Sequence, residues 1–248
     1  MNNLLTVKDL SKSFGALRAS DGISLDVAEG ETHAVIGPNG AGKTTFIGQL
    51  AGNLRPDAGR IAFAGEDITR LPAARRARKG LARSFQITSV YTDFTALENV
   101  ALAVLAHSGR TGFWRDARND ASLLAPARRV LEDVGFGEAR FNVLAGNLAH
   151  GEQRQLEVAM ALATRPRLLL LDEPMAGMGT EESRRMIALL AGLKRRQTIV
   201  LVEHDMDAVF RLADRISVLV YGRVIATDTP EKIRANEEVR RAYLGEDF

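Results

Sequence analysis

Apolar and polar residues alternate near the start of the chain, over residues 4–10 and 23–27. Alternation with a period of two is typical of antiparallel strands that expose one face to water. Three later runs, 32–37, 168–172 and 198–204, are almost continuously apolar. Continuous apolar strands that alternate with helices predict a mostly parallel sheet that is covered on both faces.

Helical spacing follows the first apolar run and returns in the middle of the chain. Residues 43–50 read as a helix that opens directly from a glycine-rich turn. Between about 88 and 165 there is no convincing apolar strand, and the apolar spacing predicts helices over 95–106, 127–135 and 151–164. Thr95 is the expected N-cap of the first of these helices. We therefore expect a helical insert within an α/β core.

The end of the chain predicts a hairpin, because two apolar runs, 215–220 and 223–227, flank Tyr221-Gly222. No internal repeat and no long linker divides the 248 residues. We expect a single domain over 1–248. Residues 1–87 and 166–248 form its core with an N-terminal antiparallel β subdomain, and residues 88–165 form its helical subdomain.

Composition is that of a globular protein, with 46% hydrophobic and 26% charged residues, which excludes the disordered and collagen-like classes. Thirty-three basic residues against 31 acidic ones leave a net charge of +2. So small a positive charge is no argument for a nucleic-acid partner, and we expect none. The absence of cysteine excludes disulfides, zinc–thiolate sites and cysteine nucleophiles. No apolar run approaches the roughly 20 residues that span a bilayer. With no secretory signal pattern, we expect a cytoplasmic protein that can still dock on a membrane protein.

Residues 37–44 fit the phosphate-loop pattern G-x-x-x-x-G-K-[ST]. Glycines in such a loop let backbone N–H groups curl around a phosphate, the lysine reaches the β and γ phosphates, and the hydroxyl binds Mg²⁺. An ordinary glycine turn is the alternative, but the flanking strand and helix disfavour it. The predicted nucleotide-binding residues are Gly37, Pro38, Asn39, Gly40, Ala41, Gly42, Lys43 and Thr44.

A second motif, LLLLDEP, occupies residues 168–174. A buried strand would deliver Asp172 to the sheet edge where ligands bind, and Asp172 can hold the Mg²⁺ bound by Thr44 through water. The next residue, Glu173, projects elsewhere and can polarise an attacking water. A solvated acidic turn is the alternative. His204 ends the next apolar strand and can donate to a γ-phosphate, or it is merely exposed.

The order of these elements resembles the ATP-binding subunit of an ABC transporter over essentially the whole chain. The matching positions are Phe14, Gly37–Thr45, Gln86, LAHGEQ at 148–153, LLLLDEP at 168–174 and His204. The resemblance implies ATP and Mg²⁺ as cofactors and adds Thr45 to the phosphate loop. It implies that Phe14 stacks on adenine and that Gln86 approaches Mg²⁺ and the water. Glu173 becomes the catalytic glutamate and His204 the switch histidine.

The family signature L-S-G-G-Q matches Leu148–Glu152. The resemblance implies that Gly151 and Glu152 contact nucleotide across a nucleotide-sandwiched dimer, formed with a second copy or with a sister ATPase. It also implies two integral-membrane permeases as partners and, through them, a substrate-binding protein. The chain would then lie peripherally on the cytoplasmic face of the inner membrane. Ala149 and Glu152 depart from the signature, and Gly179 replaces a frequent Asp, so we expect ATP-driven dimerisation to be weak.

Finer similarity is to importers of branched-chain or other hydrophobic amino acids. It lies in LAHGEQRQLEVAMAL, DEPMAGM, the FWRDAR segment at 113–118 and the tail at 242–246. The aromatic and basic residues of 113–118 read as a surface hairpin or as a membrane-contacting patch. Urea or amide import and lipopolysaccharide export remain alternatives. A single cassette without heptads disfavours a translation or DNA-repair factor, and the signature segment disfavours a phosphate-loop kinase.

Overall fold

The computed structural model describes residues 3–84, 90–108 and 120–244. Its centre is a six-stranded sheet in the order β10-β9-β3-β8-β7-β6. The three middle strands are parallel and fully buried, as their continuous apolar runs predict. The strands are β3 (Thr32–Ile36), β6 (Leu81–Arg83), β7 (Leu168–Asp172), β8 (Thr198–Val202), β9 (Arg215–Val220) and β10 (Arg223–Asp228).

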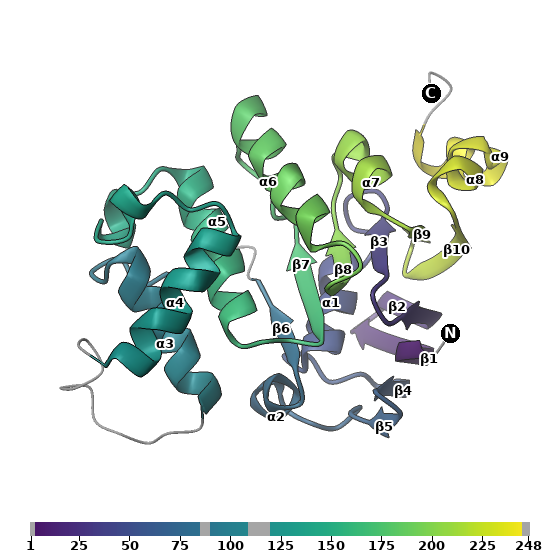
Figure 1. Ribbon diagram of the computed structural model, residues 1–248. Coiled ribbons are helices and arrows are strands. Elements are labelled where there is room, and N and C mark those ends of the chain that lie inside the picture. The colour runs from purple at the N-terminus through teal and green to yellow at the C-terminus, as the bar shows by residue number, and fades with distance from the viewer. Residues whose placement is uncertain (1–2, 85–89, 109–119, 245–248) are drawn as a thin grey trace.

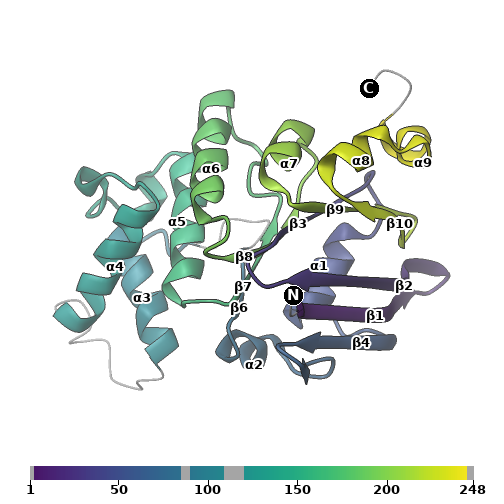
Figure 2. The same ribbon diagram turned by 45° about the vertical axis from the view of Figure 1, so that its right-hand side comes forward.

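A second, antiparallel sheet has the order β2-β1-β4-β5. Its strands are β1 (Asn3–Phe14), β2 (Leu17–Ala28), β4 (Ala58–Phe63) and β5 (Glu66–Asp67). Helix α1 (Lys43–Ala51) lies between the two sheets, and its Phe46, Ile47 and Leu50 share one apolar core with both (Figure 2). The phosphate-loop helix is therefore clamped on two sides. The predicted fold class, an α/β core with an antiparallel β subdomain, is confirmed.

A buried arginine also anchors the C-terminal end of α1. Arg76 belongs to α2 (Ala73–Arg78), and its guanidinium donates to the carbonyl oxygens of Gln49 and Leu50, each at 2.7 Å. Burial lowers the pKa of Arg76 to about 10. The last carbonyls of a helix lack intrahelical donors. Arg76 thus supplies donors to the end of α1 that is opposite the phosphate loop.

Three helices gather at one side of the molecule around a separate apolar core (Figure 1). They are α3 (Ala96–Ser108), α4 (Ala121–Asp133) and α5 (His150–Ala163). Thr95 caps α3 as predicted, because its hydroxyl accepts from the Glu98 amide and its own amide donates to the Glu98 carboxylate. The predicted start of the second helix at 127 is wrong. That helix begins at Ala121, because Asp120 accepts from the Ser122 amide and caps it.

The remaining helices lie at the ends of core strands. α6 (Thr180–Leu193) and α7 (Met206–Leu212) share an apolar core with β7 and β8. α8 (Pro230–Ala235) and α9 (Glu237–Val239) follow β10. The predicted hairpin is present, and its turn residues Tyr221 and Gly222 both have positive φ, as a two-residue hairpin turn requires. Among the described residues, no helix combines the length and apolar character needed to cross a bilayer.

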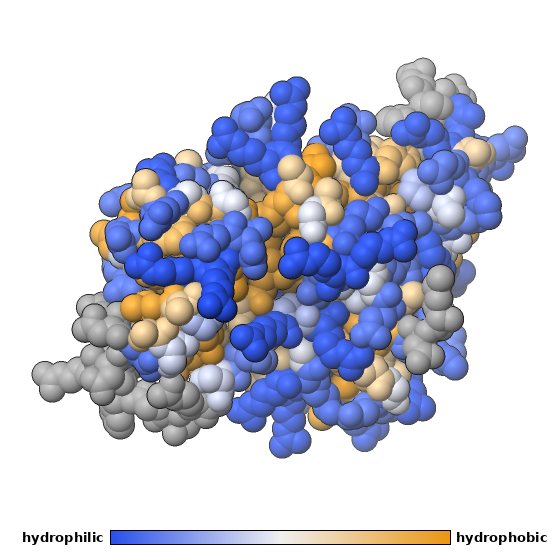
Figure 3. Space-filling view, in the orientation of Figure 1, coloured by the Kyte–Doolittle hydropathy of each residue, from blue (hydrophilic) through white to orange (hydrophobic). Residues whose placement is uncertain are grey.

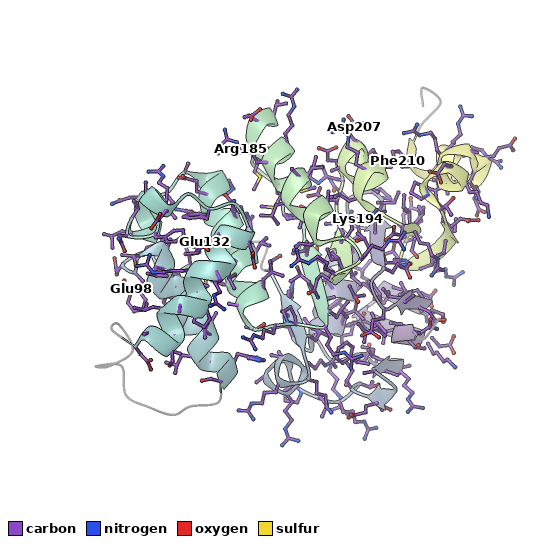
Figure 4. All side chains as sticks on the ribbon, viewed as in Figure 1. Glu98, Glu132, Arg185, Lys194, Asp207 and Phe210 are labelled. Atoms are coloured by element: carbon purple, nitrogen blue, oxygen red, sulfur yellow. The ribbon has the colours of Figure 1, made fainter. Side chains whose placement is uncertain are left out.

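A crevice of about 1140 Å³ separates the three-helix group from α6. Leu162, Leu189 and Leu193 are among its lining residues, and apolar surface gathers in the hollow there (Figure 3). Arg185 of α6 lies beside it (Figure 4). The helical group and the sheet core therefore meet through an incompletely filled boundary.

Candidate functional site

The glycine-rich loop at 37–42 joins the buried strand β3 to α1 and is lodged against two other strands. A Cβ on Gly37 would overlap the carbonyl oxygen of Leu219 in β9, and a Cβ on Gly42 would overlap that of Ala19 in β2. Gly42 also has a φ of 103°, which side chains disfavour. Glycine is thus required at both ends of the loop by space as well as by backbone conformation.

Lys43 directs its ammonium back across the loop. Nζ donates to the carbonyl oxygens of Gly37 at 2.6 Å and Pro38 at 3.0 Å. Burial lowers the pKa of Lys43, whereas the Asp172 and Glu173 carboxylates act to raise it. This opposition places the ammonium within the electrostatic influence of both acids. A phosphate entering the loop would meet a cation that is already positioned there.

Asp172 ends β7 and is 1% exposed. Its Oδ2 accepts from Arg83 Nη2 at 2.9 Å, while its buried Oδ1 has no hydrogen-bond partner among the described residues. A buried anionic oxygen without a donor is costly unless something binds it. Oxygen ligands are those that Mg²⁺ prefers, so the donor set fits that ion, with Asp172 and the exposed hydroxyl residue Thr44 as its predicted ligands.

Glu173 has the left-handed backbone conformation, with a φ of 50°. Such a conformation is strained for a residue other than glycine, and strain of this kind gathers at functional sites. The Glu173 amide donates to the carbonyl oxygen of Val202 at 2.9 Å, which anchors the turn on β8. Glu173 Oε1 lies 3.9 Å from His204 Nδ1. Two sequence-predicted residues, from the ends of adjacent strands, are thereby brought together.

Glu203 was missed by the sequence analysis. Its side chain is fully buried, and its carboxylate accepts from the amides of Met175, His204 and Asp205 at 3.0, 3.0 and 3.4 Å. Burial raises the pKa of Glu203. The carboxylate thus joins the turn after Glu173 to the turn that carries His204. The sequence held one signal for it, because Glu203 is an acidic residue within the otherwise apolar run 198–204.

Gly151 and Glu152 open α5, in the three-helix group. Glu152 accepts from Arg140 through both carboxylate oxygens, at 2.8 and 2.9 Å, and also from the Ala149 amide at 2.9 Å. The Arg140 partner of Glu152 was not predicted from the sequence. A Cβ on Gly151 would lie 2.7 Å from the Glu182 carboxyl group of α6. Gly151 therefore lies directly against the Glu182 side chain of α6.

The other predicted site residues are less constrained. Phe14 ends β1 with its residue 49% exposed, and Lys12 Nζ lies 5.6 Å from the ring centroid. An accessible ring is compatible with stacking on a base, which stays a prediction. Gln86, the FWRDAR segment at 113–118 and Glu246 lie outside the described residues.

A groove of about 440 Å³ runs between α2, α3 and α5 on the side of α5 opposite the crevice. Tyr91, 53% exposed, lines it and stacks on Phe94 with ring centroids 5.5 Å apart. Asn99 holds the Tyr91 backbone through both its amide and its carbonyl group. Val90, next to Tyr91 in the chain, is half-buried and packs against the helical core.

Comparison with known proteins gives the family of the chain. A family model described as ABC transporter matches residues 20–176, and one described as branched-chain amino acid ATP-binding cassette transporter matches residues 223–248. The chain is 41% identical, over 98% of both chains, to the high-affinity branched-chain amino acid transport ATP-binding protein BraF of Pseudomonas aeruginosa. It is 33% identical, over 99% of both chains, to the lipopolysaccharide export system ATP-binding protein LptB of Haemophilus influenzae.

The fold agrees as well. A crystal structure described as the ADP conformation of an ATP-binding cassette of an ABC transporter superposes with a TM-score of 0.86 at 27% identity. The match covers 99% of this chain and all of that one. Fold, motif order and sequence identity therefore lead to one conclusion: the chain belongs to the ABC transporter family, as one of its ATP-binding cassettes.

Proposed function

We propose that this cassette hydrolyses ATP to power an importer of branched-chain or other hydrophobic amino acids. The observation that carries the proposal is the meeting of Lys43, Asp172, Glu173 and His204 at one sheet edge, in a chain 41% identical to BraF. The match of residues 223–248 to a branched-chain amino acid model favours import. Lipopolysaccharide export is the second candidate, supported by the full-length similarity to LptB.

The side chains divide the chemistry among them. Lys43 neutralises β- and γ-phosphate charge, and Asp172 with Thr44 holds Mg²⁺. When bound, that ion would offset the negative charge that develops during phosphoryl transfer. Glu173 accepts a proton from the attacking water as general base. His204, 3.9 Å from Glu173, donates to the γ-phosphate from the adjacent turn.

The signature segment would act on a second cassette. Gly151 and Glu152 would close the open side of nucleotide bound by the partner, whether that partner is a second copy or a sister ATPase. Arg140 lowers the electrostatic cost of this approach, because it neutralises Glu152 before ATP arrives. Phe14 would stack on the adenine of the nucleotide in its own loop.

The groove between α2, α3 and α5 would receive a short helix from one of two integral-membrane permeases, and the groove of the second cassette would receive one from the other. Its apolar lining residues include Ala77, Leu102 and Met160, and the exposed Tyr91 stands at the same groove. Apolar grooves of this kind accept amphipathic helices. The cassette would then lie peripherally on the cytoplasmic face of the inner membrane, with a substrate-binding protein reached only through the permeases.

A reconstitution tests the proposed function. The cassette is placed in proteoliposomes with the permeases that co-purify with it, and uptake of radiolabelled leucine is measured with ATP inside or outside. ATP-dependent leucine uptake is the expected result. Two results together would favour export over import. Leucine, urea and amides would all fail to enter, and lipopolysaccharide would be released in an ATP-dependent way from membranes that contain an export permease pair.

Tyr91→Glu is expected to weaken co-purification of the cassette with its permeases by about fivefold or more, because a charge would replace an anchoring aromatic. Nucleotide affinity of the isolated cassette should be retained. Leu144→Glu is the matched control, since Leu144 is an exposed apolar residue outside the groove lining. Equal co-purification of the Tyr91→Glu variant and the control would refute the groove as the docking surface.

A further inference from the structure

Arg83 lies between the groove formed by α2, α3 and α5 and the carboxylate of Asp172, the predicted Mg²⁺ ligand. It is the last residue of β6 and pairs in parallel register with Leu170 of β7. Successive side chains on a strand alternate between faces, so Leu170 and Asp172 share one face. Arg83 reaches along that face, and its Nη2 donates to Asp172 Oδ2 at 2.9 Å.

The same side chain also forms part of the groove wall. Arg83 lines the 440 Å³ groove together with Tyr91, Met160 and Glu157. Its side chain is 14% exposed, whereas that of Asp172 is 1% exposed. One end of Arg83 is thus accessible from the groove, and the other end is bonded to a carboxylate that solvent does not reach. Within the described residues, the ion pair of Asp172 is the one with Arg83.

The bond to Arg83 sets the direction of Asp172. With Oδ2 held, the buried Oδ1 is left as the oxygen without a donor. Charge-assisted hydrogen bonds are short and directional, so they hold a carboxylate in one rotamer. If the bond to Arg83 were lost, the other cation that acts on Asp172 would be Lys43. The carboxylate would then be able to turn toward the Lys43 ammonium, and Oδ1 would no longer be held as the oxygen that is open to Mg²⁺.

We propose that Arg83 is a positioning residue that connects the groove to the metal site: an occupant of the groove that shifts Arg83 changes how Asp172 is presented to Mg²⁺. The inference rests on the proposed function, because it takes the permease helix as the occupant. The effect would pass from the groove to the metal site through the Arg83–Asp172 salt bridge. Arg83 would act through Asp172 rather than on the nucleotide.

The test measures metal binding directly, with Mn²⁺ as the probe. Mn²⁺ affinity is determined by electron paramagnetic resonance on the isolated cassette with saturating ADP. Arg83→Met should weaken Mn²⁺ binding about tenfold, the size expected for a lost hydrogen bond between charged groups. ADP affinity in EDTA should stay unchanged, which shows that the loop is intact. Arg83→Lys should recover part of the loss, because it restores a cation but not the planar donor.

Arg75→Met is the matched control, since Arg75 is an exposed arginine of the adjacent α2. It should bind Mn²⁺ like the unmodified protein. In proteoliposomes, permeases should stimulate hydrolysis by Arg83→Met less than half as strongly as they stimulate hydrolysis by Arg75→Met. Mn²⁺ affinity of Arg83→Met within twofold of the unmodified protein would overturn the inference. An unmodified cassette that bound no Mn²⁺ with ADP would overturn the proposed function itself.

Discussion

Lys43→Ala is expected to lower ATP hydrolysis by at least about a hundredfold, the scale seen when one preorganised charge-stabilising group is removed from an active site. Nucleotide affinity should fall as well. The reason is the position of the ammonium, which is held at the loop by the Gly37 and Pro38 carbonyls and lies near two acids. Without it, the negative phosphates would face Asp172 and Glu173 without the ammonium that offsets their charge.

Phosphate release and the affinity for a fluorescent ATP analogue would be measured on folded protein, with circular dichroism as the folding check. Lys232→Ala serves as the control, because Lys232 is an exposed lysine that pairs with Asp228 on the surface. The control should match the unmodified protein in both measurements. Hydrolysis by Lys43→Ala at the unmodified rate would remove the loop from the catalytic site.

Glu173→Gln is expected to keep ATP bound while hydrolysis falls by roughly a hundredfold or more, as loss of a general base does. The amide is nearly the same size as the carboxylate but cannot take the proton of the attacking water. Uncleaved ATP should remain between two cassettes and hold them together. Ala149 lacks the hydroxyl expected at the signature, so the homodimer should be weak, and the physiological pair can be a heterodimer with a sister ATPase.

Light scattering with ATP and EDTA, against ADP, would measure the dimer, and phosphate release would measure turnover. Glu132→Gln is the control, since Glu132 is an exposed acid on α4 (Figure 4). Hydrolysis by Glu173→Gln at the unmodified rate would exclude Glu173 as the base. An inactive variant that stays monomeric at high concentration would favour the heterodimer over the homodimer.

The buried strands of the core were predictable because burial on both faces requires an unbroken apolar run, and β3, β7 and β8 have one. Shorter elements escaped for a physical reason. β6 has three residues, too few for any period to show, and the first three residues of β4 are exposed. Those strands form through pairing with distant neighbours, Leu168–Leu170 for β6 and Val7–Lys8 for part of β4. The hydrophobic pattern within a short segment does not reveal which distant strand will pair with it.

In the candidate site, too, some residues were predictable from local motifs and others depend on distant parts of the chain. A motif places Asp172 and Glu173 at the end of a strand, and the structure has them there. The partners that orient them come from elsewhere in the chain: Arg83 is 89 residues from Asp172, and Glu203 is 28 residues from Met175. Neither partner belongs to a phosphate-loop pattern. Motifs therefore predicted the reacting groups, and folding was needed to find the groups that position them.

The ion pair between Arg140 and Glu152 joins two segments that could mutate independently. Loss of Arg140 alone would leave a bare acid at the signature, whereas loss of Glu152 alone would leave an unneutralised arginine there. Each single change carries a penalty that the double change avoids. Across related cassettes, the two positions are therefore expected to covary: an acid at 152 should occur with a base at 140, and a neutral glutamine at 152 should release position 140 from selection.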